Sequence, residues 1–210
     1  MEWQLFAGVP EEDVRRLLAI ARRRTFARNE VVFHRGDPAN SLHLIASGRF
    51  GVAIITPLGD TAMLGVRGPG EAFGELALVS GGQAERSATV SALEPGETRC
   101  VHQNDFARLR REHPRIDAVL TAVLAESVRR LSDQVTDAYY LSAERRVLRR
   151  LAELAELYNG CVTLPQEAIA ELAGTSRATV NRVLREQERK GTLELGRSRI
   201  VFSDPGSPPA

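Results

Sequence analysis

The segment Gln166–Gly191, QEAIAELAGTSRATVNRVLREQERKG, decides the fold of the second half of this chain. It contains two helical patterns, each with an apolar face. These faces are formed by Ile169, Leu172, Val180, Val183 and Leu184. Between the two patterns, Ala173 and Gly174 are small enough to allow a sharp turn, and Ser176 can cap the second helix. The spacing predicts a helix-turn-helix, a unit that places the start of its second helix in the major groove of DNA.

The side chains expected to face bases or phosphates lie at this turn and on the first turns of the second helix. They are Thr175, Ser176, Arg177, Thr179, Asn181 and Arg182. Arg177 and Arg182 have the side chain that holds guanine O6 and N7 through two hydrogen bonds. Residues 174–202 carry 7 basic and 3 acidic groups, a surplus of the sign that phosphate contacts need. A helical hairpin with a solvated basic face is the alternative that the same residues allow.

The segments around this motif complete a small domain. Helical patterns cover 142–157, 166–172 and 176–190, and two β-prone segments follow on either side of Gly196 and Arg197. Three helices followed by a hairpin is the order of a winged helix domain, which we expect to span 142–203. The tail 204–210, DPGSPPA, has nothing to bury and is predicted to be disordered.

The first half of the chain has a different pattern. A short helix can begin at Pro10, and from Thr25 to His102 the chain consists of short β-branched or alternating segments. Turn signals such as RGDP at 35–38 and GPG at 68–70 separate these segments. Many short strands at this spacing predict a sandwich, jelly roll or small barrel.

Between the two halves, a long helix is predicted from Pro114 to about Tyr140. Alternate steps of four and three mark a seam that would pack against a partner helix. The residues of this seam are Leu120, Leu124, Ser127, Leu131, Gln134, Ala138 and Leu141. The alternative is an amphipathic helix lying on its own β-domain through Ile116, Val119, Val123 and Val128.

A second motif joins Gly74-Glu75-Leu76 to Arg86-Ser87 across a loop. The glycine lets backbone N–H groups approach an anion, the carboxylate can bind ribose hydroxyls, and the arginine with the serine suits a phosphate. This set of groups fits a sugar phosphate. An internal ion pair between Arg86 and Glu75 in an empty pocket is the alternative.

From about Leu5 to Phe202, the chain resembles the Crp/Fnr family of bacterial transcription regulators. Arg177 and Arg182 match the family's two base-reading arginines. Gly74, Glu75, Arg86 and Ser87 match its phosphate-binding cassette, in which the glutamate holds the ribose 2′-hydroxyl and the arginine pairs with the cyclic phosphate. The resemblance implies a DNA-binding homodimer on a palindromic operator, with cAMP or another cyclic nucleotide as allosteric effector and RNA polymerase as a further partner.

The implied fold is α+β, with an N-terminal jelly-roll β-barrel of the cyclic-nucleotide-binding type and a C-terminal winged helix-turn-helix. The expected domains are an effector domain at 1–112, a dimerisation helix at 113–141 and the DNA-binding domain at 142–203. Self-association is assigned to the helix 114–141.

Two departures from the family pattern concern residues that would contact bases. Ala178 stands where a glutamate usually accepts from a cytosine amino group, so relaxed or altered readout of that base is expected. Leu131-Ser132 aligns with the Thr-Ser pair that contacts adenine in the cyclic-AMP receptor, and a leucine cannot hydrogen-bond the adenine amino group. A regulator of the same fold that needs no effector remains the alternative.

Length and composition limit the other classes of protein. The 210 residues suit two domains, and 43% hydrophobic with 26% charged residues is typical of a soluble protein. No apolar run approaches a membrane span and no secretion signal is present, so we expect a cytoplasmic protein. We expect no metal site, no covalent cofactor and no catalytic residues, because no nucleophile elbow or Walker loop occurs. Cys100 and Cys161 are expected to be buried apolar residues, with redox sensing as the alternative.

Overall fold

The computed structural model describes residue 6 and residues 9–55, 61–79 and 84–203. The chain divides into two compact units, one of residues 1–54 and 65–131, the other of residues 55–64 and 132–210. The tail 204–210, predicted to be disordered, lies outside the described residues. No helix of the described residues is both long enough and apolar enough to span a membrane.

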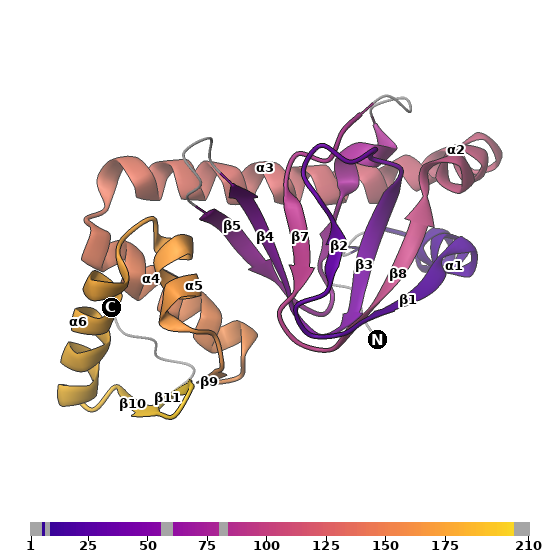
Figure 1. Cartoon of the computed structure of the whole chain (residues 1–210). Helices are drawn as coiled ribbons and strands as arrows, with labels where there is room; N and C mark the ends of the chain where they lie inside the picture. Colours follow the sequence, from indigo (N-terminus) through magenta and orange to yellow (C-terminus); the bar gives the residue numbers. More distant parts are fainter. Residues whose placement is uncertain (1–5, 7–8, 56–60, 80–83, 204–210) are drawn as a thin grey trace. The chain divides into compact units, whose positions relative to one another are not determined.

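The β-strands of the first half form two four-stranded sheets (Figure 1). One has the order β1-β8-β3-β6 and the other β2-β7-β4-β5. The strands are β1 (Arg22–Phe26), β2 (Val31–Phe33), β3 (Ser41–Ser47), β4 (Phe50–Ile55), β5 (Thr61–Arg67), β6 (Ala72–Phe73), β7 (Thr89–Ala92) and β8 (Gly96–His102). Among the described residues, no strand pairing joins the two sheets into a closed barrel. The α+β class with an N-terminal jelly roll is otherwise confirmed.

Two apolar clusters stabilise the first unit. The first lies under the helices α1 (Glu11–Ile20), α2 (Gln103–Glu112) and the start of α3 (Asp117–Tyr140), and Leu17 and Phe106 are at most 1% exposed in it. The second is aromatic and joins strands of both sheets, with Phe26 edge-on to Phe50 at 5.6 Å and Phe50 5.3 Å from Phe73. Burial of such side chains is worth about 1.5–3 kcal/mol each.

The long helix follows a 3-10 turn at Pro114–Ile116, and its inward face differs from the predicted seam. Leu120 is 6% exposed in the first cluster, and Ser127 and Gln134 hydrogen-bond to Glu75 and to the carbonyl of Leu64. These three seam positions therefore face their own chain, and their assignment to a partner-facing seam was wrong. The exposed large apolar residues of the helix are Val128, Leu131 and Val135, at 54–63% exposure, followed by Tyr139 and Tyr140.

The alternative, in which the long helix lies on its own β-domain, is only partly right. Ile116, Val119 and Val123 are buried in their own unit, as that alternative predicts, but Val128 is 63% exposed. The helix thus carries two apolar faces, one packed inward near its start and one exposed further along.

The second unit contains three helices that pack against one another and a three-stranded sheet of order β10-β11-β9. The elements are α4 (Ala143–Leu157), β9 (Cys161–Val162), α5 (Gln166–Ala173), α6 (Arg177–Arg189), β10 (Leu193–Gly196) and β11 (Arg199–Phe202). The predicted helix-turn-helix is confirmed: Gly174 ends α5 in the left-handed conformation (φ 58°), and the Ser176 hydroxyl caps α6 by accepting from Thr179 N at 3.2 Å.

Burial of the cysteines differs from expectation. Cys100 is partly buried, but Cys161 is exposed. The cause is the alternation of β9, in which Val162 faces the core and Cys161 faces outward.

Candidate functional site

Gly74 lies in a position that only glycine fits. It has φ 80° and precedes the short 3-10 helix η2 (Glu75–Leu78). A Cβ atom there would lie 2.6 Å from Arg86 Nη1 and 2.9 Å from the carbonyl oxygen of Ser41. Both the left-handed backbone and the close approach of the arginine therefore require the missing side chain.

Arg86 is a buried cation, with 5% of its surface exposed. Its Nη1 donates to the Ser41 carbonyl at 2.7 Å and its Nη2 donates to the Ser41 hydroxyl at 2.8 Å. The guanidinium lies 3.9 Å from the centre of the Phe33 ring. Its Nε is buried without a hydrogen-bond acceptor, and none of the ion pairs between described residues involves Arg86. Burial lowers the pKa of Arg86.

A buried polar chain continues behind Arg86. The Ser41 hydroxyl lies 3.4 Å from His43 Nε2, and His43 Nδ1 lies 3.0 Å from the Thr98 hydroxyl. The imidazole stacks on Phe73 at 5.0 Å. Burial, and next the charge of Arg86, lower the pKa of His43 to about 3, so this histidine is neutral at physiological pH.

Glu75 does not pair with Arg86. Its Oε1 accepts a hydrogen bond from the Ser127 hydroxyl of α3 at 3.1 Å. Within the described part of the chain, no ion pair joins Glu75 to Arg86, so the internal pair that the sequence allowed is not formed. The structure thus brings Gly74, Glu75 and Arg86 to one site.

The other predicted ligand-binding residues are exposed. Ser87 follows Arg86 at the surface, and Leu76 is 41% exposed on η2. On α3, Leu131 is 54% exposed one turn beyond Ser127, and Ser132 follows it at the surface.

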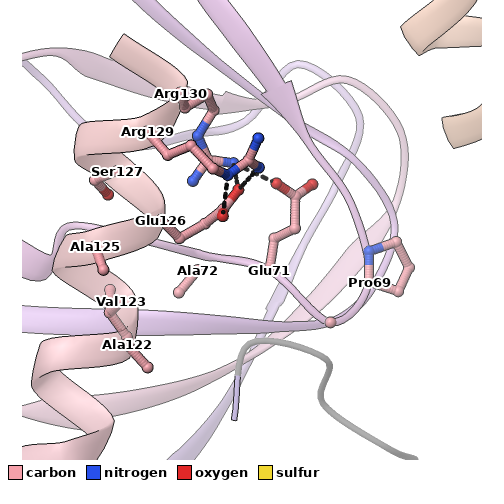
Figure 2. A pocket seen from close by; sticks show the side chains of 11 residues that line it. Pro69, Glu71, Ala72, Ala122, Val123, Ala125, Glu126, Ser127, Arg129 and Arg130 are labelled. Atoms are coloured by element: carbon pink, nitrogen blue, oxygen red, sulfur yellow. Dashed lines mark hydrogen bonds and ion pairs between the residues drawn. The ribbon is translucent and has the colours of Figure 1, made fainter. Parts of the chain in front are cut away.

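A pocket of about 640 Å³ opens next to this site, between α3 and the loop before β6 (Figure 2). Its wall is partly apolar, with Ala72 and Val123, and its charged groups are Glu71, Glu126, Arg129 and Arg130. Figure 2 shows these four side chains gathered, with Arg130 Nη1 2.6 Å from Glu71 Oε1 and Arg129 Nη2 2.7 Å from Glu126 Oε1. None of the seven predicted ligand-binding residues lines this pocket.

The predicted DNA-contacting residues lie just before α6 or in its first half. Ser176, Arg177, Asn181 and Arg182 are exposed, and Thr175 and Thr179 are half-buried. Besides Ser176, which caps α6, two of the exposed side chains have partners within the unit. Asn181 Nδ2 donates to Gln166 Oε1 at 3.2 Å, and Arg182 Nη2 lies 2.6 Å from Glu144 Oε1.

The turn of this motif has a support that the sequence motif does not include. Arg146 of α4 donates from Nε to the Ala173 carbonyl at 2.8 Å and from Nη2 to the Gly174 carbonyl at 2.9 Å. Its Nη1 also donates to the carbonyl of Leu141 at 3.0 Å. Arg146, Ser41 and Glu144 were missed in the sequence because each acts on a residue far along the chain.

Comparison with known proteins matches both halves of the chain. The family model of the cyclic nucleotide-binding domain covers residues 23–113, and that of the Crp-like helix-turn-helix domain covers residues 145–207. The chain is 33% identical over 193 residues to the cyclic AMP receptor protein of Thermus thermophilus, covering 91% of this chain and 88% of that protein. The chain belongs to the Crp/Fnr family.

A second relative and a solved structure agree with this assignment. The CRP-like cAMP-activated global transcriptional regulator of Mycobacterium tuberculosis is 31% identical, and the match covers 95% of this chain and 92% of the relative. The c-di-GMP responsive global regulator CLP of Xanthomonas campestris has the same fold, with a TM-score of 0.78 over 93% of this chain and 100% of that chain at 22% identity. This Crp/Fnr protein is a DNA-binding transcription regulator that carries a cyclic-nucleotide-binding domain.

Proposed function

We propose that a cyclic nucleotide such as cAMP binds at Gly74, Glu75 and Arg86 and controls the binding of this regulator to its operator. The observation that carries this proposal is the buried Arg86, which has no carboxylate partner among the described residues and leaves its Nε donor unsatisfied. Burying an uncompensated charge is costly, and such a group is retained where an anion completes it.

The chemistry of the surrounding groups supports a sugar phosphate. A phosphate would give Arg86 the acceptors that it lacks, through charge-assisted hydrogen bonds. Gly74 leaves the backbone open to the anion, and Ser87 adds a hydroxyl at the surface. Glu75, directly after Gly74, has carboxylate oxygens that can accept from ribose hydroxyls. Leu76, Leu131 and Ser132 are assigned to the same ligand, toward its base.

For DNA, we propose a homodimer on a palindromic operator with half-sites one helical turn apart. Arg177 and Arg182 read guanines, and Thr175, Ser176, Thr179 and Asn181 contact bases or phosphates. The small exposed Ala178 leaves the base at its position without a hydrogen-bond partner from that side chain.

Dimerisation is assigned to α3, within the predicted range 114–141. The exposed stripe of Val128, Leu131 and Val135 repeats at steps of three and four residues, which is the spacing of a helix-helix seam. This stripe replaces the seam through Ser127 and Gln134.

The effector is proposed to act by shifting the population of the dimer toward the conformation that binds DNA. Ligand contacts α3 through Glu75 and Ser127, the helices of the dimer change their packing, and the two α6 helices reach a separation that fits the operator. The bound dimer then regulates by contacting or blocking RNA polymerase.

Two measurements test this proposal. Calorimetric titration of the full-length protein with cAMP and with cGMP should show binding that Arg86→Ala abolishes. An operator selected from random-sequence duplexes should then be bound more tightly when the nucleotide is present. Binding of nucleotide that leaves operator affinity unchanged would refute the allosteric control.

The alternative is a regulator of the same fold that needs no effector. The hydrogen bonds that already hold Arg86 and Glu75 are compatible with it, because both groups are ordered within the chain. It predicts operator binding of the same strength in wild-type protein and Arg86→Ala, with no heat of nucleotide binding.

A further inference from the structure

A second arginine lies close to the proposed effector site. Arg67 is the last residue of β5, and its side chain folds back over Gly65 of the same strand. A Cβ atom at Gly65 would lie 2.4 Å from Arg67 Nη1, so any larger residue there would displace the guanidinium. Glycine inside a strand weakens it, and such a residue often marks a place where another group or a ligand approaches closely.

The guanidinium of Arg67 has few partners in the protein. Its Nη1 donates to the carbonyl of Val66 at 3.2 Å, and none of the ion pairs between described residues includes Arg67. The nearest carboxylate along the chain is already engaged. Glu71 Oε1 pairs with Arg130 at 2.6 Å (Figure 2). Glu71 Oε2 accepts from Gly68 N at 2.7 Å. Glu126 is likewise held by Arg129.

Arg67 lies between two residues that are held to α3. The carbonyl of Leu64 accepts a hydrogen bond from Gln134, and Glu71 pairs with Arg130. The electrostatic effects agree with this placement. Burial, and next the charge of Arg130, lower the pKa of Arg67 to about 10, while Glu71 and Glu75 oppose that shift. Glu75 also opposes the lowering of the pKa of Arg86 by burial. Glu75 therefore interacts with both guanidinium groups, and Arg67 remains a cation at neutral pH.

The order of these groups follows from their contacts. Arg86 lies against Gly74 and Ser41, whereas Glu75 reaches Ser127 on α3. The segment that carries Arg67 is held further along α3, at Arg130 and Gln134, on either side of Leu131. From Arg86 along α3, the charged groups are thus Arg86, Glu75 and Arg67.

We propose that Arg67 reads the base of the effector and makes the site prefer guanine over adenine. This inference rests on the proposed function, because it needs Arg86 to hold the phosphate and Glu75 the ribose. Phosphate, ribose and base follow one another in a nucleotide, and Arg67 is the third group in the matching order.

The preference for guanine follows from the chemistry of the guanidinium. Arginine only donates hydrogen bonds, in a planar fork. Guanine offers O6 and N7 as two adjacent acceptors, whereas adenine presents a donor, N6–H₂, beside N7. Leu131 offers adenine no compensating group, because its side chain neither donates nor accepts.

The test is calorimetric titration of the full-length protein with cAMP, cGMP and cyclic di-GMP. In the wild type, a guanine nucleotide should bind at least 10-fold more tightly than cAMP. Arg67→Met, which keeps the length of the side chain but removes the donors, should weaken guanine binding about 10- to 100-fold, the range for one bidentate contact, with little effect on cAMP. Arg67→Lys should fall between, because it keeps the charge without the fork. Comparison of the titrations with cGMP and with cyclic di-GMP shows which of these two nucleotides binds more tightly.

Two controls separate base reading from other effects. Arg130→Met removes a neighbouring charge that faces Glu71, and it should change the affinities for cAMP and cGMP by the same factor. Circular dichroism and thermal unfolding report whether each variant is folded.

The outcomes distinguish this inference from the function on which it rests. If wild-type protein binds cAMP as tightly as guanine nucleotides, or if Arg67→Met weakens both equally, base reading by Arg67 is wrong while nucleotide control stands. If no nucleotide binds and Arg86→Ala changes nothing, the effector site itself is refuted.

Discussion

Glu144 Oε1 lies 2.6 Å from Arg182 Nη2, so one of the two arginines proposed to read DNA is ion-paired within its own unit. Glu144 lies in the first turn of α4, and both side chains are at least half exposed. DNA must therefore compete with a carboxylate for this guanidinium.

Replacing this carboxylate should strengthen DNA binding. Exposed ion pairs are worth about 0–1 kcal/mol, so Glu144→Gln should raise operator affinity up to about 5-fold. Removal of a negative charge near the phosphates acts in the same direction. Fluorescence anisotropy at two salt concentrations measures both effects.

Glu156→Gln is the matched control for this variant. It makes the same charge change at an exposed position of α4, and none of the ion pairs between described residues involves Glu156. An equal gain in both variants would show that overall charge, and not the contact with Arg182, is responsible.

The exposed stripe of α3 predicts where the dimer can be broken. Val135 is 54% exposed in the chain, and a charge there would be buried against a partner helix. Val135→Glu should weaken the dimer at least 10-fold in analytical ultracentrifugation. Ala118→Glu, at an exposed position on another side of the same helix, should leave it unchanged. Equal sedimentation of both variants and the wild type as dimers would move the interface elsewhere.

His43 should make the stability of the first unit depend on pH. Its pKa in the folded protein is about 3, below the ordinary 6.5, because burial and then Arg86 disfavour the charged ring. The unfolded chain therefore binds more protons between these values, and stability is lost as pH falls below about 6.5.

The slope attributable to one such group is about 1.4 kcal/mol per pH unit. The free energy of unfolding of the wild type and of His43→Gln is measured with denaturant at several pH values between 6 and 4. The difference between the two slopes against pH gives the contribution of His43, because the carboxylates contribute equally to both. Parallel slopes would mean that His43 is not kept neutral by the fold.

Local motifs were predictable from the sequence, and contacts between distant residues were not. The turn at Gly174 and the cap at Ser176 each depend on neighbouring residues, and both were found where expected. The left-handed Gly74 occurs where the anion-binding motif needs it. By contrast, Ser41 is 45 positions from Arg86, and nothing in its surroundings marks it as a partner.

The seam of α3 shows why periodicity alone was insufficient. This helix has apolar residues on two faces, and steps of three and four fit both. Leu120 is buried in the first apolar cluster, whereas Val128 and Val135 remain exposed. Only the packing of the folded chain shows which apolar residues of the helix are buried and which are exposed. The domain limits at 112, 141 and 203 stay predictions, as do the roles of the site residues.

The two kinds of DNA contact on α6 should differ in their response to mutation. Arg177 is exposed at the first position of the helix, where side chains reach base edges, whereas Arg189 lies in its last turn. Arg177→Ala should cost about 1–3 kcal/mol on the selected operator and relax the choice of base at one position in each half-site. Arg189 is expected to contact a phosphate, so Arg189→Ala should weaken binding to all sequences equally and reduce the salt dependence by about one ion per protomer.

Repeating the selection from random duplexes with each variant measures the base preference, and salt titrations measure the ion release. Loss of base preference in Arg189→Ala, with none in Arg177→Ala, would reverse the proposed orientation of α6 on DNA.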